Sequence, residues 1–225
     1  MNRAGKLGAV IVAAGTSQRM AGINKLFVYL SGKPLLAWSV DTCQGCSLIQ
    51  QIALVLNDDD LVRGQKLQEE RGWYKVTLSQ GGVRRQDSVR EGLRQIRNCE
   101  WVMIHDGARP FLTLNLIEQG LDAVGETGAA VAAVPVKDTI KLAADQRLVE
   151  RTLQRNRLWA AQTPQIFSFD MITTAYENVR TEITDDAAAI ERLGYKVKLY
   201  MGDYKNIKVT TGEDLALSHI IAQSI

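Results

Sequence analysis

Hydrophobic and polar positions alternate along the 225-residue chain with two different periods. A uniformly apolar run predicts a buried strand at 7–14, and further apolar runs predict strands at 51–56, 74–78, 101–105 and 129–134. Between them, apolar residues at helical spacing predict helices at 35–43, 58–71, 86–97 and 113–124. Such alternation is typical of βαβ units. It predicts an α/β fold with a doubly wound, mostly parallel sheet, whose ligand site lies at the carboxyl ends of the strands.

The pattern changes after Pro135. Two short strands at 139–143 and 147–152 predict a protruding β-hairpin arm, residues 137–155, which is too short for another βαβ unit. Because an isolated hairpin is marginal in water, we expect this arm to pack against a second subunit in a homodimer. The remaining predicted elements are helices at 168–180, 184–193 and 211–223 and a strand at 196–200.

The composition is that of an ordinary globular chain, with 46% hydrophobic and 23% charged residues, and we interpret residues 1–225 as one domain. A net charge of +2, no long basic tract and only 6% aromatic residues argue against a nucleic acid polymer as partner. No apolar run approaches the 18 residues of a membrane-spanning helix, so we expect no membrane partner.

Three cysteines, Cys43, Cys46 and Cys99, form a sparse and odd-numbered set that favours a reducing compartment, the cytoplasm, over a disulfide framework. Cys43 and Cys46 have the spacing of a redox motif or of half a zinc site. Since the chain has no second pair, we interpret them as structural thiols.

The turn after the first predicted strand is suited to binding a phosphate. Gly15 lets the backbone approach a ligand, and a helix after the turn would offer unpaired N–H groups and its positive dipole end. Arg19 adds a permanent cation. Neither G-x-x-x-x-G-K-[ST] nor G-x-G-x-x-G is present here, which argues against an ATPase or a dehydrogenase. The alternative is an ordinary strand and turn with Arg19 merely solvated.

A second glycine loop, Gly81-Gly82, follows the third predicted strand and leads into a helix. Two adjacent glycines permit backbone N–H and C=O groups to contact the edge of a flat base. The alternative is a flexible turn in which Asp87 or Ser88 caps the helix.

The fourth predicted strand ends in His105-Asp106-Gly107-Ala108-Arg109-Pro110, at the edge where this architecture binds ligands. The Asp106 carboxylate can accept hydrogen bonds from sugar hydroxyls or from water on a metal, and Arg109 can pair with it or reach an anion. In the structural alternative, Asp106 caps the loop and Arg109 bridges to it. We interpret His105 as a packed strand residue.

In this order the motifs resemble the 2-C-methyl-D-erythritol 4-phosphate cytidylyltransferase family. The resemblance covers essentially the whole chain and continues through 138–139, 155–159, 162–165, 184–186 and 206–210. It implies a Rossmann-like nucleotidyltransferase fold and the transfer of a cytidylyl group from CTP to the polyol phosphate, with release of pyrophosphate, in non-mevalonate isoprenoid synthesis. It further implies a homodimer and Mg²⁺ or another divalent cation, held mainly by the CTP phosphates, with no residue of the chain expected as a metal ligand.

The resemblance also implies residue roles. The nucleotide would be bound by Ala13, Ala14, Gly15, Gly81, Gly82, Ser88, Asp106 and Gly107. The catalytic cations would be Arg19, Lys25, Arg155 and Lys208. The acceptor would be bound by Asp106, Arg109, Thr139, Arg155, Thr163 and Lys208. Because Arg155 lies at the base of the arm, we expect it to act in the neighbouring subunit's site. Val83 stands where many relatives have an acidic or small polar residue. This difference affects only one side-chain contact in the loop expected to bind the base.

Charge supports this interpretation, because a triphosphate of about −4 must meet a monophosphate of about −2, and several cations are needed to hold both. An alternative is a ribitol or ribulose 5-phosphate cytidylyltransferase, although 155–159 favours the erythritol enzymes by resemblance. A regulatory nucleotide-binding module without chemistry is a further alternative. Arg19, Lys25, Asp106 and Lys208 together argue against it.

Overall fold

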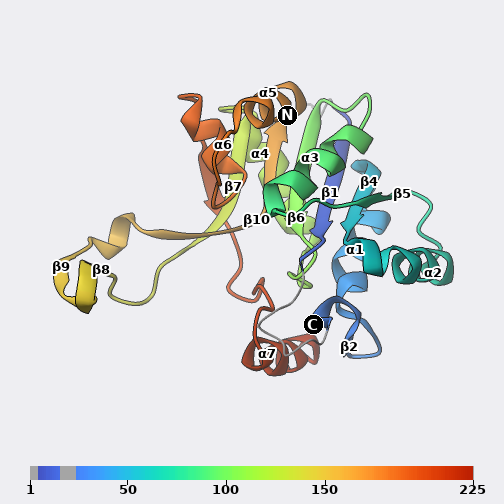
Figure 1. The fold of residues 1–225 in the computed structure, drawn as a ribbon, viewed down its shortest axis with the longest axis horizontal. Helices are drawn as coiled ribbons and strands as arrows, with labels where there is room; N and C mark the ends of the chain where they lie inside the picture. Colours follow the sequence, from blue (N-terminus) through green and yellow to red (C-terminus); the bar gives the residue numbers. More distant parts are fainter. Residues whose placement is uncertain (1–4, 16–23, 225) are drawn as a thin grey trace.

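A seven-stranded sheet forms the centre of the computed structural model, which describes residues 5–15 and 24–224 (Figure 1). The strand order is β11-β7-β10-β6-β1-β4-β5. The strands are β1 (Leu7–Ala13), β4 (Ile49–Leu56), β5 (Val76–Gln80), β6 (Trp101–Asp106), β7 (Ala129–Pro135), β10 (Trp159–Ser168) and β11 (Lys198–Met201). Only β10 runs antiparallel to its neighbours in this sheet. The predicted α/β class and mostly parallel sheet are confirmed.

Helices cover both faces of the sheet (Figure 1). One buried cluster joins the sheet to α1 (Leu35–Gly45), α2 (Leu61–Arg71) and α4 (Leu114–Val124), and a second joins it to α3 (Arg85–Gln95), α5 (Phe169–Asn178) and α6 (Ala187–Arg192). The last helix, α7 (Gly212–Ala222), packs with residues around β2 (Tyr29–Leu30). The chain therefore winds in both directions from β1, and the strand order reverses between β1 and β6, where such folds bind ligands.

Local sequence explains where the helices begin and end. Thr113 accepts a hydrogen bond from the Leu116 N–H at the start of α4, and Thr211 forms a capping box with Asp214 at the start of α7. Gly72 ends α2 in the left-handed conformation that glycine tolerates best. The predicted helix at 184–193 is shorter in the structure, because the helix begins only after Asp186.

Strand β10, which inserts between β6 and β7, was not predicted from the sequence pattern. Its apolar run is broken at 162–165 by Gln, Thr, Pro and Gln, and a proline argues against a central strand. The structure accommodates Pro164 because the pairing with β7 skips residues 162–164 and the pairing with β6 begins only at Gln165, so no ladder hydrogen bond depends on its missing N–H. The short pair β2 and β3 (Lys33–Pro34) was likewise not predicted.

The predicted arm is confirmed as a hairpin of β8 (Lys141–Ala143) and β9 (Val149–Thr152) that extends away from the sheet (Figure 1). Every residue of both strands is exposed, and Leu142, Leu148 and Val149 present apolar side chains. The helix predicted after Gly15 falls in residues 16–23, outside the described part of the chain.

Cys43 in α1 and Cys46 directly after this helix are buried in the core, as expected for structural thiols. Within residues 5–15 and 24–224, no helix is long and apolar enough to cross a bilayer.

Gly92 sets how closely α3 packs on the sheet. A Cβ there would lie 2.3 Å from Val10 Cγ1 and 3.0 Å from Val55 Cγ2. Both valines are fully buried on strands and stiff about χ1, so neither can move away without cost.

We therefore expect Gly92→Ala to lower the free energy of unfolding by about 1–3 kcal/mol, even though alanine favours helix. Gly45 in α1 is the matched control, because its Cβ would meet nothing within 4 Å. Gly45→Ala should leave stability unchanged or raise it by up to about 1 kcal/mol. Urea unfolding of both variants measures this, and equal effects at the two positions would contradict the packing role of Gly92.

Candidate active site

A cavity of about 470 Å³ opens at the carboxyl ends of β1, β5 and β6. This volume is within the range of small-molecule sites. Its wall is formed by Val12, Ala13, Ala14, Gly15, Lys25, Leu26, Gly82, Val83, Arg84, Arg85, Ser88, Asp106, Ala108, Lys208 and Thr210. The first glycine turn, the Gly81-Gly82 loop and the end of β6 thus meet around one space, as the parallel strand order predicts.

The two glycine loops pack directly against each other. A Cβ on Gly81 would lie 2.4 Å from the Cβ of Ala14 and 2.7 Å from Ser88 Oγ. The Gly82 N–H donates to Ser88 Oγ at 3.2 Å. Gly107 is also confined, although less tightly, with Ala13 Cβ and Leu36 Cδ1 each 3.0 Å from its hypothetical Cβ. Gly81 and Gly107 are therefore required for close packing behind the cavity, whereas Gly82 and Ser88 lie on its wall.

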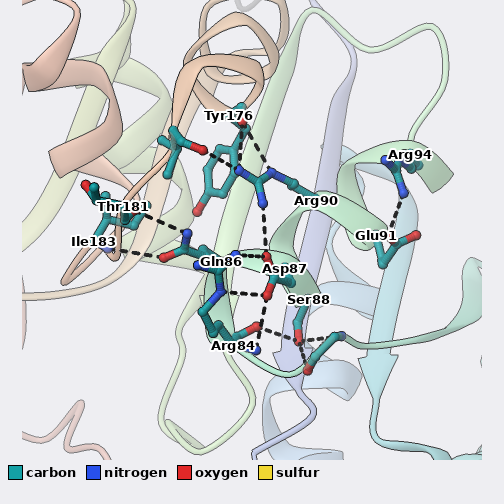
Figure 2. Close-up of polar contacts among 12 residues, drawn as sticks. Arg84, Gln86, Asp87, Ser88, Arg90, Glu91, Arg94, Tyr176, Thr181 and Ile183 are labelled. Atoms are coloured by element: carbon teal, nitrogen blue, oxygen red, sulfur yellow. Dashed lines mark hydrogen bonds and ion pairs between the residues drawn. The ribbon is translucent and has the colours of Figure 1, made fainter.

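The start of α3, directly after the Gly81-Gly82 loop, is held by side-chain contacts on two sides (Figure 2). Asp87 accepts hydrogen bonds from the backbone and side chain of Arg84, so the predicted alternative of a capping Asp87 is confirmed. The Gln86 amide donates to the Thr181 carbonyl and accepts from the Ile183 N–H at 3.1 Å. These contacts fix the loop against the segment between α5 and α6.

Asp106, at the end of β6, is surrounded by cations. Lys208 Nζ lies 2.8 Å and Arg85 Nε 3.0 Å from its carboxylate oxygens, and Arg109 Nε lies 3.9 Å away. Burial alone would raise the pKa of this carboxyl, but the charges of Arg85, Lys208 and Arg109 hold the pKa well below its usual range. Asp106 is therefore ionised at neutral pH, and we call these four residues the Asp106 cluster.

Arg85 connects the Asp106 cluster to Asp186, which directly precedes α6. Its guanidinium binds the fully buried Asp186 through two hydrogen bonds of 2.9 and 2.8 Å, while its Nε reaches Asp106. Tyr176 also donates to Asp186. Although burial would lower the pKa of Arg85, the two carboxylates raise it above its usual value, so the charge is permanent. Even with Asp186 counted, the three cations of the Asp106 cluster face only two carboxylates, which leaves an excess of positive charge.

Lys208 is positioned by its neighbours in the chain. The Val209 N–H donates to the Ala108 carbonyl at 2.8 Å, and the buried Asn206 amide donates to the Thr163 carbonyl at 2.8 Å. Arg109 donates to the Asn206 carbonyl at 2.7 Å. The segment 206–210 is therefore fastened along the end of β6, which places the half-exposed ammonium of Lys208 at the cavity.

A chain of hydrogen bonds behind Asp106 fixes its backbone. The Asp106 N–H donates to Thr163 Oγ1, which lies 3.0 Å from His105 Nδ1, and His105 Nε2 lies 3.0 Å from the Arg109 carbonyl. Since a carbonyl only accepts, Nε2 carries the proton and Nδ1 accepts from the Thr163 hydroxyl. Burial lowers the pKa of His105 to about 4, so the ring is neutral and structural, as predicted.

The structure brings most of the predicted site residues together. On the cavity wall lie Ala13, Ala14, Gly15, Lys25, Gly82, Ser88, Asp106 and Lys208. Thr163 is buried and Arg109 is partly buried, and neither is on the wall: they support Asp106 and segment 206–210 from behind it, which matches the structural alternative for Arg109. Their predicted contact with the acceptor stays a prediction. Arg19 lies outside the described residues.

Thr139 and Arg155 lie at the base of the arm and not on the wall of this chain's cavity. Arg155 is exposed and donates to the Lys137 carbonyl at 2.7 Å. Their predicted role in an active site therefore depends on a second subunit.

Sequence reasoning missed Arg85 and its partner Asp186 as members of the site. Arg85 is one of two adjacent arginines, and nothing in the pattern distinguishes it from Arg84. Asp186 stands 101 residues further along the chain, so only the fold reveals the pair.

The comparisons with known proteins agree with the geometry. The family model described as 2-C-methyl-D-erythritol 4-phosphate cytidylyltransferase matches residues 7–224. Curated relatives with that name include one from Dehalococcoides mccartyi, 48% identical with 96% of each chain covered, and one from Alkaliphilus oremlandii, 39% identical with 100% of this chain and 98% of the relative covered.

Solved structures show the same likeness. The 4-diphosphocytidyl-2C-methyl-D-erythritol synthase of Anaerococcus prevotii superposes with a TM-score of 0.87 at 30% identity, covering 97% of this chain and 96% of that one. The 2-C-methyl-D-erythritol 4-phosphate cytidylyltransferase of Thermus thermophilus gives a TM-score of 0.78 at 27% identity, with 97% and 99% covered. The chain belongs to the 2-C-methyl-D-erythritol 4-phosphate cytidylyltransferase family.

Proposed function

We propose that the cavity binds CTP and 2-C-methyl-D-erythritol 4-phosphate side by side and transfers the cytidylyl group between them. A phosphate oxygen of the acceptor attacks the α-phosphorus of CTP, the new P–O bond forms, and pyrophosphate leaves. The observation that carries this proposal is the meeting of two glycine loops, Lys25 and the Asp106 cluster around one cavity of about 470 Å³. Family membership favours this acceptor over ribitol or ribulose 5-phosphate.

The residues of the cavity divide into two groups by chemistry. Backbone groups of Ala13 to Gly15 and of Gly82 offer neutral donors close to a nucleotide, with Ser88 holding the loop in shape. Lys25, and with it Arg19, is proposed to stabilise charge on the phosphates of CTP as the bond breaks. Since the attacking phosphate oxygen is already ionised, alignment and charge stabilisation are sufficient, and no general base is needed.

The Asp106 cluster is proposed to bind the acceptor. Its excess positive charge attracts a phosphate through Lys208, while the ionised Asp106 carboxylate accepts hydrogen bonds from hydroxyl groups. Arg85 and Lys208 neutralise Asp106, which keeps its negative charge from repelling the nearby phosphates.

Mg²⁺ is proposed as the metal of the reaction. Among the described residues, no group of three or more His, Cys, Asp or Glu could hold a metal. The cavity wall nevertheless fits a phosphate-bound Mg²⁺, because this ion commonly takes substrate phosphates and at most one or two carboxylates, and Asp106 lies on the wall. When bound, the ion supplies neutralisation of phosphate charge.

A cytoplasmic homodimer is proposed as the working form. The arm exposes Leu142, Leu148 and Val149, and a hairpin with exposed apolar residues gains stability by packing on a partner. The three free thiols suit a reducing compartment.

The reaction is tested by incubating the enzyme with CTP, Mg²⁺ and either 2-C-methyl-D-erythritol 4-phosphate or ribitol 5-phosphate. We expect stoichiometric pyrophosphate and cytidylylated product with the erythritol acceptor. Faster turnover of ribitol 5-phosphate would refute the proposed acceptor.

In the same assay, Lys208→Met should lower kcat/KM by about 100-fold or more, because one preorganised cationic donor is lost. Lys205→Met is the matched control, since this exposed lysine bonds Ser224 and its replacement should leave activity near wild type.

The shared site is tested by mixing two impaired proteins. If Arg155 serves the partner's site, a mixed dimer of Lys25→Met and Arg155→Ala subunits has one site with both defects and one with neither. With random pairing, roughly half the dimers are mixed, so roughly a quarter of wild-type activity should return. If activity stays flat after verified subunit exchange, Arg155 acts in its own subunit.

His105 predicts a pH dependence of stability. The pKa of its buried ring is about 4, against an ordinary value of 6.5, so below pH 6.5 the unfolded chain takes up a proton that the folded chain does not. Stability should therefore fall as the pH drops from 6.5 towards 4, by roughly 2–3 kcal/mol from this group.

Urea unfolding at pH 7, 6, 5 and 4.5 measures this, and His105→Gln should flatten that part of the profile. The exposed His219 supplies the control, because His219→Gln should keep the wild-type slope. Identical slopes for both variants would show that His105 is not the titrating group.

A further inference from the structure

We propose that Asp60 is a positioning residue that acts through Asn24 to hold Lys25 at the cavity. This inference rests on the proposed function, because it assigns Lys25 to the phosphates of CTP. The observation behind it is a contact between two segments far apart in the sequence: the Asn24 side-chain amide donates to the carboxylate of Asp60.

Asn24 holds the backbone that carries Lys25. Its side-chain oxygen caps the 3-10 helix η2 (Lys25–Phe27) by accepting from the Leu26 N–H at 3.2 Å, while its amide nitrogen is directed to Asp60. Leu26 is 2% exposed and anchors the helix in the core. One side chain therefore both begins the helix and ties it to a neighbouring element, so a shift of Asn24 moves Lys25 with it.

Asp60 is well suited to be the fixed end of this link. Its side chain is only 4% exposed, on η3 (Asp58–Asp60), which follows the carboxyl end of β4. Asn57 donates to the same carboxylate at 2.7 Å and caps η3 by accepting from the Asp60 N–H at 2.9 Å. The helix α2 that follows packs tightly on β4, since a Cβ on Gly64 would lie 2.2 Å from Leu56 Cδ1. Asp60 is thus held in place by Asn57, which directly follows β4, and by a helix that packs against β4.

Arg63, one turn further along α2, forms a second connection between the two elements. Its guanidinium lies 4.0 Å above the ring of Phe27, the last residue of η2, and 3.6 Å from Asp60. Both ends of η2 are therefore tied to the η3–α2 segment, one through Asn24 and one through Phe27. Lys25 lies between these ties and on the cavity wall.

The consequence for catalysis follows from geometry. A cation stabilises a transferring phosphate only when its donor atom is held in place, and a displacement of about 1 Å at such a position can cost up to about 100-fold in rate. Asn24 follows the first glycine turn and residues 16–23 in the chain. Asp60, which belongs to a different part of the sequence, holds Asn24 through a side-chain hydrogen bond. Asp60 itself does not lie on the wall of the cavity.

The test compares Asp60→Ala and Asn24→Ala with Asp59→Ala, the matched control. Asp59 is an exposed carboxylate on the same 3-10 helix, so its removal changes the charge equally. We expect kcat with CTP and 2-C-methyl-D-erythritol 4-phosphate to fall on the order of 10- to 100-fold in the first two variants, with the KM for the acceptor changed less than about threefold. Asp59→Ala should keep wild-type kcat. Thermal melting verifies that each protein is folded, and Asn24→Ala tests the link if Asp60→Ala does not fold.

A double-mutant cycle separates positioning from general damage. In a Lys25→Met background, Asp60→Ala or Asn24→Ala should lower kcat by less than about twofold further, because the residue they position is already gone. A full loss in both backgrounds would mean structural damage and would overturn the inference, as would wild-type kcat in both single variants while Lys25→Met is impaired. Wild-type kcat in Lys25→Met alone would instead overturn the proposed role of Lys25.

Discussion

The architecture of the site depends on one buried carboxylate and the cations that neutralise it. Asp106 sits at the end of β6, where the strand order reverses, and it draws Arg85 from the start of α3 and Lys208 from the C-terminal segment to the same point. Arg85 extends the link to Asp186 before α6. Four stretches of chain that are distant in sequence therefore meet around one charge. Were Asp106 neutral, the cations around it would repel each other at this edge of the sheet.

Stability alone does not account for this arrangement. Taking charges out of water costs free energy that their mutual attraction only partly returns, and buried ion pairs are often no more stabilising than well-packed apolar residues. The cluster is explained better by what it can bind. Its three cations outnumber Asp106 and Asp186, so it presents a positive field beside a cavity wall that includes the small residues Ala14, Gly15 and Gly82, where a phosphate can come close. The same ion pairs also keep Arg85 and Lys208 oriented before any ligand arrives, which reduces the ordering that binding requires.

Sequence reasoning succeeded where the signal is periodic or local. The parallel strands, most helices, the arm and the two glycine loops follow from apolar runs and turn residues, because buried strands and amphipathic helices have different periods. It failed for β10, because Pro164 and the polar residues around it break the apolar run of a central strand, although residues 162–164 have no ladder partner. It also failed for Arg85, since a charged residue next to an identical one carries no local mark of burial. Pairings such as Arg85 with Asp186 are decided by tertiary packing, which no local pattern encodes.

The same distinction explains why the two ends of the site are supported differently. The Asp106 side is rigid through buried charge and through the Asp106–Thr163–His105 hydrogen bonds, all within the core. The Lys25 side lies after a glycine turn and outside any strand, so its position must be imposed by contacts with neighbours, among them the hydrogen bond between Asn24 and the buried carboxylate of Asp60. Both supports originate at strand ends next to β1, namely β6 and β4. The strands on either side of β1 thus hold one supporting carboxylate each, Asp106 at the end of β6 and Asp60 after β4. The spacing between the Asp106 cluster and Lys25, which the proposed function assigns to the acceptor and to the nucleotide phosphates, therefore depends on the strands that support them more than on the intervening loops.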